Sequence, residues 1–113
     1  MWIEGDGTWR MIAPTEPGAR PGTTGGDMVM WVSKDQGARW VKVRQLTRGR
    51  AGRNHTYAKK PVEAHRDFYA LWADGDPLAR SGSSLYYTNR EGTGVWRLPE
   101  KMKGEWAKPE RVR

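Results

Sequence analysis

Cysteine is absent from this chain of 113 residues, which excludes disulfide bonds, thiolate catalysis and cysteine-ligated metal sites. Long apolar runs are also missing, because none approaches the roughly 20 residues that a membrane-spanning helix needs. Residues 1–6 show neither the basic nor the apolar region of a signal peptide. We therefore expect no membrane partner, and any export signal of the parent protein should lie outside this chain.

Several motifs of enzyme chemistry are missing as well. No glycine-rich phosphate loop lies between a strand and a helix, and the G-x-S-x-G motif is absent. The two histidines fall on opposite faces of the expected fold, and the carboxylates lack the spacing of metal ligands. The sequence predicts no metal and no cofactor.

Aromatic residues are plentiful but unevenly chosen, with seven Trp and four Tyr against one Phe. Aromatic rings with a polar group suit both β-sheet faces and sugar-stacking surfaces. We expect Trp31, Trp40 and Trp72 in the core, and Trp2 and Trp9, which are flanked by glycine and charge, at exposed stacking positions.

The formal net charge is +7 and the isoelectric point is near 10.1. Such a surplus attracts polyanions, which include nucleic acid, anionic lipid and acidic polysaccharide. A basic β domain that binds nucleic acid remains an alternative, but the basic residues are dispersed and no RNP, KH or zinc-finger signature is present. Charge alone does not choose among these partners.

One octet organises the chain: residues 33–40 read S-x-D-x-G-x-x-W between two runs rich in β-branched and aromatic residues. Asp35 can accept hydrogen bonds from turn amides, and Gly37 can adopt positive φ. Trp40 brings an apolar surface back under the turn. The octet therefore predicts a hairpin turn that Ser33, Asp35, Gly37 and Trp40 stabilise.

The second half of the chain repeats the first. Trp40 recurs as Trp96 and Val29 as Leu85, at the same spacing, while the second turn loses the aspartate and is degenerate. We predict strands over residues 9–15, 28–32, 40–46, 54–62, 68–73, 84–88 and 95–98. A repeat of this length with about four strands is typical of a β-propeller blade.

The expected fold class is all-β, with about two four-stranded antiparallel propeller blades over residues 1–102. The first blade, about 1–47, is incomplete, and its innermost strand is missing or reduced to 1–3. The second blade, about 54–100, is complete, and residues 103–113 form a charged tail that is irregular or helical. A small antiparallel sheet or sandwich is the alternative. Two blades cannot close a ring, so we expect a fragment that associates with further blades or with itself.

Taken with segments 12–18, 25–28, 54–57, 68–75 and 95–99, the octet resembles the Asp-box of BNR-repeat proteins, the sialidase-like β-propellers. This resemblance implies a secreted or periplasmic parent that binds or degrades an acidic extracellular glycan, as a sialidase-like hydrolase or a polysaccharide lyase. It also allows a non-catalytic carbohydrate-binding or structural module. In such proteins the Asp-box is a structural turn on the face away from the ligand.

The same resemblance places a candidate site where one blade connects to the next. Arginines could pair with the carboxylate of an anionic polysaccharide, while a histidine or tyrosine moves protons. The candidate substrate-binding residues are Arg48, Arg50, Arg53, Asn54 and Lys59, and the candidate catalytic residues are His55 and Tyr57. We expect alternation to place His55, Tyr57 and Lys59 on one face. The alternative is an exposed arginine loop with His55 and Tyr57 packed between blades.

Overall fold

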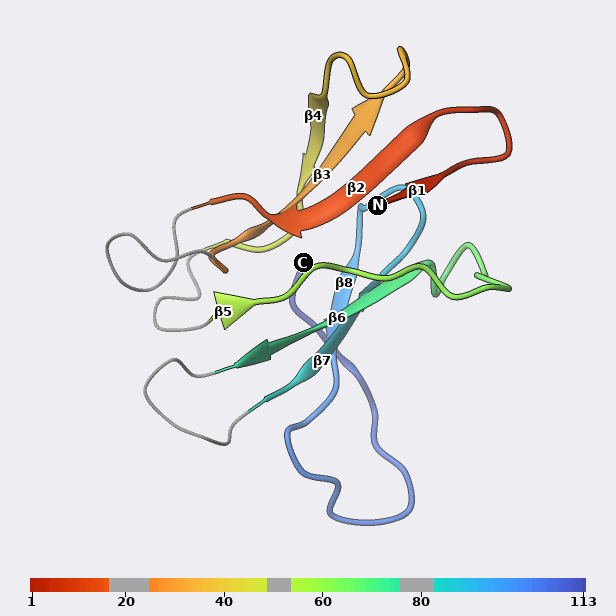
Figure 1. Cartoon of the computed structure of the whole chain (residues 1–113). Coiled ribbons are helices and arrows are strands. Elements are labelled where there is room, and N and C mark those ends of the chain that lie inside the picture. The colour runs from red at the N-terminus through yellow and green to blue at the C-terminus, as the bar shows by residue number, and fades with distance from the viewer. Residues whose placement is uncertain (17–24, 49–53, 76–82) are drawn as a thin grey trace.

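The computed structural model describes residues 1–16, 25–48, 54–75 and 83–113. These residues form strands and loops without any helix, so the predicted all-β class is confirmed. The strands form two antiparallel sheets, in the order β1-β2-β3-β4 and β5-β6-β7-β8-β9 (Figure 1). Strand order follows chain order in both sheets, as in two successive meanders.

The first sheet is built from segments whose pattern is visible in the sequence. Its strands are β1 Trp2–Ile3, β2 Trp9–Pro14, β3 Met28–Ser33 and β4 Val41–Gln45. The pairing of β2 with β3 runs from Trp9 opposite Ser33 to Pro14 opposite Met28. The register of β3 and β4 shifts between Met30 and Trp31, which leaves Val43 as the extra residue of a bulge. The expected short strand at residues 1–3 is present as β1.

The second sheet departs from the prediction near its first strand. Its strands are β5 Asn54–His55, β6 Ala70–Gly75, β7 Leu85–Thr88, β8 Val95–Arg97 and β9 Glu110–Arg111. The predicted strand over 54–62 is therefore reduced to two residues. The amide of Ala58 donates to the carbonyl of Ile12 in the first sheet, at 3.0 Å, while Lys59 bridges back to Leu71. This change of partner interrupts the regular ladder.

The carboxyl-terminal segment also corrects the prediction. Residues 103–109 are irregular, as one of the two expectations has it, but Arg111 pairs with Trp96 and Glu110 with Arg97, which makes β9 the fifth strand. Val112 packs against the core, and its amide donates to the carbonyl of Val95 at 2.8 Å. The local composition is polar, so only the open edge of β8 makes this segment a strand.

One core lies between the two sheets. Ile12, Met28, Met30 and Leu46 come from the first sheet, and Ala58, Tyr69, Ala70, Trp72, Tyr86 and Val95 come from the second. The turn before β8 approaches closely: a Cβ on Gly92, whose φ is 73°, would lie 2.9 Å from Met30 Cε. The sheets therefore pack face to face, an arrangement that neighbouring blades and a small sandwich have in common.

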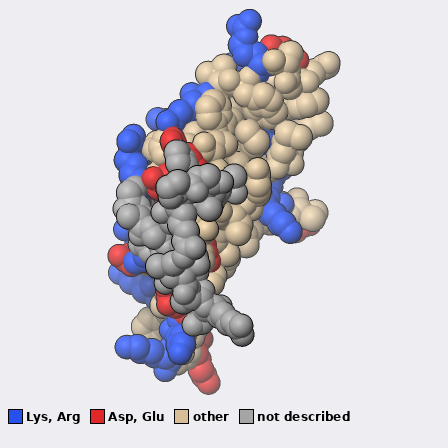
Figure 2. Space-filling view, turned by 60° about the vertical axis from the view of Figure 1, so that its left-hand side comes forward, with Lys and Arg blue, Asp and Glu red and all other residues tan. Residues whose placement is uncertain are grey.

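The positive charge is unevenly distributed over the surface. On the face in Figure 2, Lys and Arg side chains lie mainly along one border with acidic groups among them, and much of the remaining surface is uncharged. A polyanion that approaches this face would therefore meet most of the positive charge along that border.

Candidate functional site

The turn between β3 and β4 is held by side-chain to backbone hydrogen bonds. Ser33 Oγ donates to Asp35 Oδ1 and accepts from the amide of Gly37, each at 2.8 Å, and the amide of Arg39 donates to Asp35 Oδ1 at 2.8 Å. Gln36 and Gly37 have φ values of 60° and 88°. Bonds from the Arg39 amide and the Ser33 hydroxyl lower the pKa of Asp35. Asp35 is thus an ionised acceptor within a turn.

A second aromatic residue, Trp9, joins the predicted Trp40 at this turn. Trp9 packs against the turn, because a Cβ on Gly37 would lie 2.7 Å from Trp9 Cζ3. Trp40 lies beside Trp9, with 6.5 Å between ring centroids, and is half-buried. Pairing of Trp9 with Ser33 brings Trp9 to the octet. The expectation that Trp9 is an exposed stacking residue is therefore wrong.

The described residues of the predicted site around the blade connection do not lie together on one exposed surface. Arg50 and Arg53 lie outside the described residues. Arg48, Tyr57 and Lys59 are exposed, Tyr57 at 68%, and Asn54 is half-buried opposite Gly75. His55 is only 3% exposed, so it does not share the exposed face of Tyr57. The two candidate proton carriers point into different environments, because the chain turns toward the first sheet at Ala58.

His55 belongs to a buried polar layer of the second sheet. Its Nδ1 accepts a hydrogen bond from Trp72 Nε1 at 3.1 Å, and its ring meets the edge of Tyr86 at 5.2 Å. Asp74, which pairs with His55 across the sheet, accepts from the Tyr86 hydroxyl at 2.7 Å and from the Ser84 amide at 2.9 Å. Since Nδ1 is an acceptor, the proton of the neutral ring is on Nε2. Sequence reasoning missed Asp74 and Tyr86, since only pairing across strands brings them beside His55.

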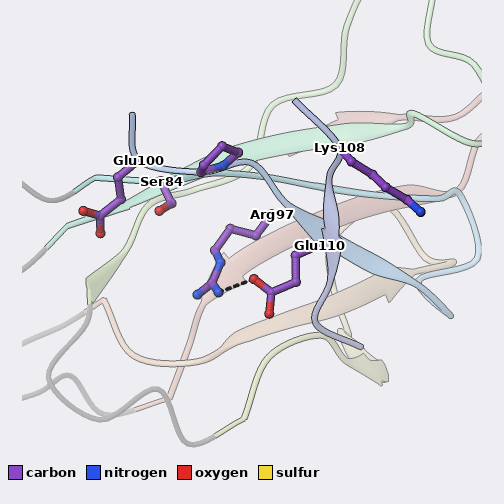
Figure 3. Close-up of a pocket in the computed structure, with 6 residues that line it drawn as sticks. Ser84, Arg97, Glu100, Lys108 and Glu110 are labelled. Atoms are coloured by element: carbon purple, nitrogen blue, oxygen red, sulfur yellow. Dashed lines mark hydrogen bonds and ion pairs between the residues drawn. The ribbon is translucent and has the colours of Figure 1, made fainter. Parts of the chain in front are cut away.

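A hollow of about 410 Å³ lies where the carboxyl-terminal segment returns to β8 (Figure 3). Its lining comprises Ser84, Arg97, Pro99, Glu100, Lys108 and Glu110. Arg97 Nη2 pairs with Glu110 Oε2 at 2.5 Å, and this hydrogen bond raises the pKa of Arg97. Arg97 pairs with Glu110 and so holds β9 against β8. Because its charge is already paired, Arg97 is poorly suited to bind an external anion.

Tyr57 and Lys59, both predicted site residues, line a different hollow of about 320 Å³, named here the Tyr57 groove. Its lining comprises Thr56, Tyr57, Lys59, Lys60, Pro61, Leu71, Trp72, Ala73 and Leu85. The part contributed by β6 and β7 is mainly apolar, whereas the segment before them supplies an exposed phenol ring and two ammonium groups. The groove therefore combines a surface for stacking with positive charge.

A second basic hollow adjoins the Tyr57 groove, because Lys60 lines both. This basic hollow measures about 320 Å³ and is lined by Glu4, Lys60, Val62, Glu63, Ala64, Arg66, Tyr69 and Arg90. Lys60 Nζ lies 5.6 Å from the centroid of the Tyr69 ring, a cation–π contact. Arg66 and Arg90 come from turns of the second sheet and are exposed. No motif in the sequence marked these two residues as neighbours.

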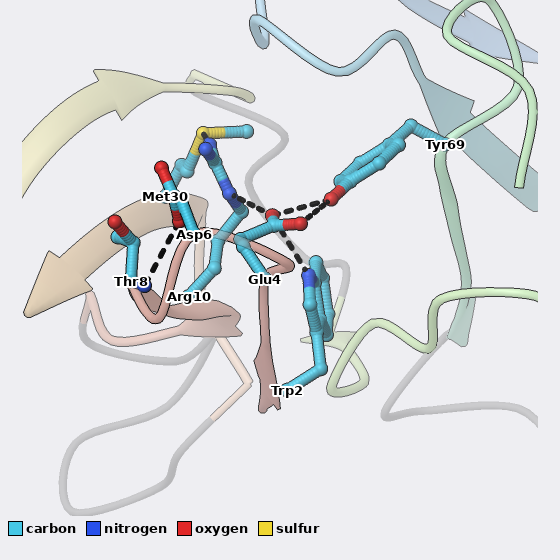
Figure 4. A network of polar contacts seen from close by, with 7 residues as sticks. All are labelled: Trp2, Glu4, Asp6, Thr8, Arg10, Met30 and Tyr69. Atoms are coloured by element: carbon cyan, nitrogen blue, oxygen red, sulfur yellow. Dashed lines mark hydrogen bonds and ion pairs between the residues drawn. The ribbon is translucent and has the colours of Figure 1, made fainter. Parts of the chain in front are cut away.

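A buried carboxylate forms one wall of the basic hollow (Figure 4). Glu4, 7% exposed, accepts hydrogen bonds from Arg10 Nε at 2.7 Å, from Trp2 Nε1 at 3.2 Å and from the Tyr69 hydroxyl. Burial raises the pKa of Glu4, but the hydrogen bonds from Tyr69, Trp2 and Arg10 outweigh it and hold the pKa below its usual value. Burial, followed by the bond to Glu4, raises the pKa of Tyr69.

Within the described ranges, no group of three or more histidine and carboxylate side chains could hold a metal ion. The part of the chain that the structure describes also contains no helix long and apolar enough to cross a membrane. Comparisons with protein-family models, curated proteins and solved structures find no match to this chain.

Proposed function

We propose that this chain contributes two neighbouring blades to a β-propeller of the BNR-repeat type, and that it binds an acidic extracellular glycan. Two serial antiparallel meanders and the hydrogen-bonded S-x-D-x-G turn support the first part. In this proposal the parent protein is secreted or periplasmic, and further blades complete the ring. The Asp-box turn serves the fold rather than the ligand.

The Tyr57 groove carries the proposal for the ligand. Tyr57 is 68% exposed and lines the groove with Lys59, Lys60 and the apolar side chains of Leu71 and Leu85. A sugar has an apolar face of C–H groups that packs on an aromatic ring, and a carboxylate or sulfate group pairs with ammonium groups. The combination suits an anionic sugar better than a neutral one.

The size of the ligand follows from the position of Lys60. A polyanion that passes over this residue leaves the Tyr57 groove and enters the basic hollow, where Arg66 and Arg90 supply two more positive charges. Glu4 and Glu63 also line the hollow, so its three cations exceed its carboxylates by one. The carboxylate of Glu4 accepts hydrogen bonds from three donors, and the charge of Arg10 offsets its own. An oligosaccharide with repeated acidic groups therefore fits better than a single acidic sugar.

Binding is a better supported role for this chain than turnover. Of the two candidate proton carriers, only Tyr57 is exposed, whereas His55 is buried against Trp72 and Tyr86. A lyase needs proton carriers within hydrogen-bond reach of the substrate. We assign Tyr57 to stacking and Lys59 to charge recognition, and any catalytic group to other blades of the parent.

The proposal is tested by calorimetry with heparin fragments and, for comparison, with neutral dextran oligosaccharides. Tyr57→Ala should weaken heparin binding about tenfold, the loss expected for roughly 1.4 kcal/mol of stacking. Lys59→Gln should weaken binding and reduce its salt dependence. The matched control is Trp106→Ala, which removes an aromatic side chain that is 81% exposed outside the groove.

Two results would overturn the proposal. The first is equal heparin affinity for Tyr57→Ala, Trp106→Ala and the unaltered chain, since the groove would then play no part. The second is tighter binding to a defined oligonucleotide than to heparin at the same salt concentration, which would favour a nucleic-acid-binding domain.

A further inference from the structure

The outer edge of β4 has no neighbouring strand among the residues that the structure describes. β4 is the last strand of the first sheet, and within the described segments no strand pairs with its far edge. All residues from Val41 to Arg44 are exposed, with Val41 at 54% and Val43 at 40%. An edge of this kind presents backbone donors and acceptors to any extended chain that approaches it.

The second sheet has an equivalent edge, on β8, and that edge is paired with an added strand. β8 occupies the place of β4 in the internal repeat, and its outer edge is covered by β9. The added strand is held by backbone pairing, by the ion pair of Glu110 with Arg97, and by Arg111, which lies 5.4 Å from the centroid of the Trp96 ring. A short segment with one acidic side chain therefore suffices to cover this edge.

The surroundings of β4 favour an acidic strand. Lys42 and Arg44 lie on β4 itself. A hollow of about 390 Å³ beside them is lined by Val32, Lys34, Asp35, Arg39, Val41 and Val43. Lys34 and Arg39 line this hollow, and Lys42 and Arg44 add two cations on the strand. Two carboxylates lie near these four cations: Asp35, which the turn engages, and Glu16, 3.8 Å from Lys42 Nζ. Arg44 Nε donates to the carbonyl of Glu91 at 3.3 Å, in an exposed contact. The valines offer an apolar surface for alternate side chains of an added strand.

The same charges disfavour copies of this chain as the occupant. A second β4 would bring Lys42 and Arg44 against like charges, which destabilises a cross-strand pair. The carboxyl-terminal segment of another copy is already paired with its own β8. The occupant must therefore come from a chain with the opposite charge.

We propose that the outer edge of β4 binds an extended acidic segment of a partner protein by strand addition. Apolar side chains of the segment cover Val41 and Val43, while its carboxylates pair with Lys42 and Arg44. Lys42 now contacts Gln45 at 2.6 Å and Glu16 at 3.8 Å. Both contacts are exposed and are weak enough to be exchanged for the carboxylates of a partner. This proposal is independent of glycan binding, because the Tyr57 groove lies on the second sheet.

The test uses the full isotope-labelled chain and a synthetic peptide in which valine and glutamate alternate. Binding should shift the amide resonances of residues 41–45 and slow their hydrogen exchange, because the peptide covers this edge. Lys42→Glu should weaken binding about three- to tenfold, since it converts an attractive surface pair into a repulsive one. The matched control, Lys103→Glu, makes the same charge change at an exposed position outside this edge and should bind as the unaltered chain does.

Three outcomes would overturn the proposal. The largest shifts could fall at Lys60 and Arg66 instead of β4, which would indicate that the peptide enters the basic hollow. A peptide of alternating valine and lysine could bind equally well, which would remove the role of charge. Equal affinity of Lys42→Glu and Lys103→Glu would exclude recognition at β4.

Discussion

The hydroxyl of Tyr69 donates a hydrogen bond to the carboxylate of Glu4, and this contact joins the first turn of one sheet to the second sheet. The bond spans 65 residues of sequence and is buried. Arg10 and Trp2 donate to the same carboxylate. Burial of a charged carboxylate is unfavourable unless it is hydrogen-bonded, and these three donors offset that cost. Its removal should loosen the packing of the two sheets.

Tyr69→Phe should lower the free energy of unfolding by about 1.5 to 3 kcal/mol, because a buried charged acceptor loses one of its donors. Urea denaturation followed by tryptophan fluorescence measures the change. Tyr87→Phe is the matched control, since Tyr87 contributes its ring to a stack on Trp96, at 5.5 Å between centroids. If the two variants are equally stable, the bond from Tyr69 to Glu4 contributes nothing to stability.

Stability should also fall at acidic pH. The pKa of Glu4 lies below its ordinary value of 4.5, so the folded state binds fewer protons than the unfolded state in this range. The stabilisation is therefore complete above about pH 4.5 and is lost as the pH falls through the lower, folded-state pKa. Denaturation curves between neutral and strongly acidic pH should show a smaller loss for Glu4→Gln than for the unaltered chain. Parallel losses in the two proteins would assign the acid sensitivity to other carboxylates.

Asp35→Ala should lower the melting temperature without changing glycan binding. The substitution removes the acceptor for the Arg39 amide and the Ser33 hydroxyl, and no part of the Tyr57 groove contains Asp35. Glu105→Ala is the control, because Glu105 is an exposed carboxylate outside the turn, the Tyr57 groove and the basic hollow. Loss of glycan binding with an unchanged melting temperature would instead make Asp35 a ligand-binding residue.

Gly37→Ala should destabilise the chain by about 1 to 3 kcal/mol, the cost of a side chain in a left-handed backbone conformation. The φ of Gly37 is 88°, and the added Cβ would also press against Trp9. Gly5→Ala provides the comparison, because no atom would lie within 4 Å of its new Cβ. A Gly37→Ala chain as stable as Gly5→Ala would contradict the packing of Trp9 under the turn.

The sequence was most informative where structure depends on neighbours along the chain. The β2, β3 and β4 strands and the octet between β3 and β4 follow from residue type and turn chemistry, which are local properties. The all-β class and the serial order of strands followed from the repeat. These features could be predicted because the sequence pattern and the hydrogen-bonding partners coincide.

Features that depend on distant partners were missed. Nothing in the polar segment around Glu110 predicts a strand, and only the edge of β8 makes it one. Alternation predicts one face for His55 and Tyr57, but His55 is buried against Trp72 and Tyr86 while Tyr57 is exposed. The chain leaves the regular ladder after Thr56, and the amide of Ala58 bonds to Ile12 of the first sheet. Trp9 joins Trp40 at the turn because β2 and β3 pair in one register. In each case, tertiary contacts overrode a correct local pattern.

The bond between the Ala58 amide and the Ile12 carbonyl joins the two sheets through main-chain atoms alone. Substitution of either side chain leaves both of these atoms in place, with proline at residue 58 as the exception because it lacks the amide proton. Ile12 and Ala58 lie in the core, so substitutions that fit its volume preserve this connection between the two sheets. This hydrogen bond depends on where the backbone runs and not on which side chains the two repeats share. It can therefore be kept even where the two repeats no longer resemble each other in sequence.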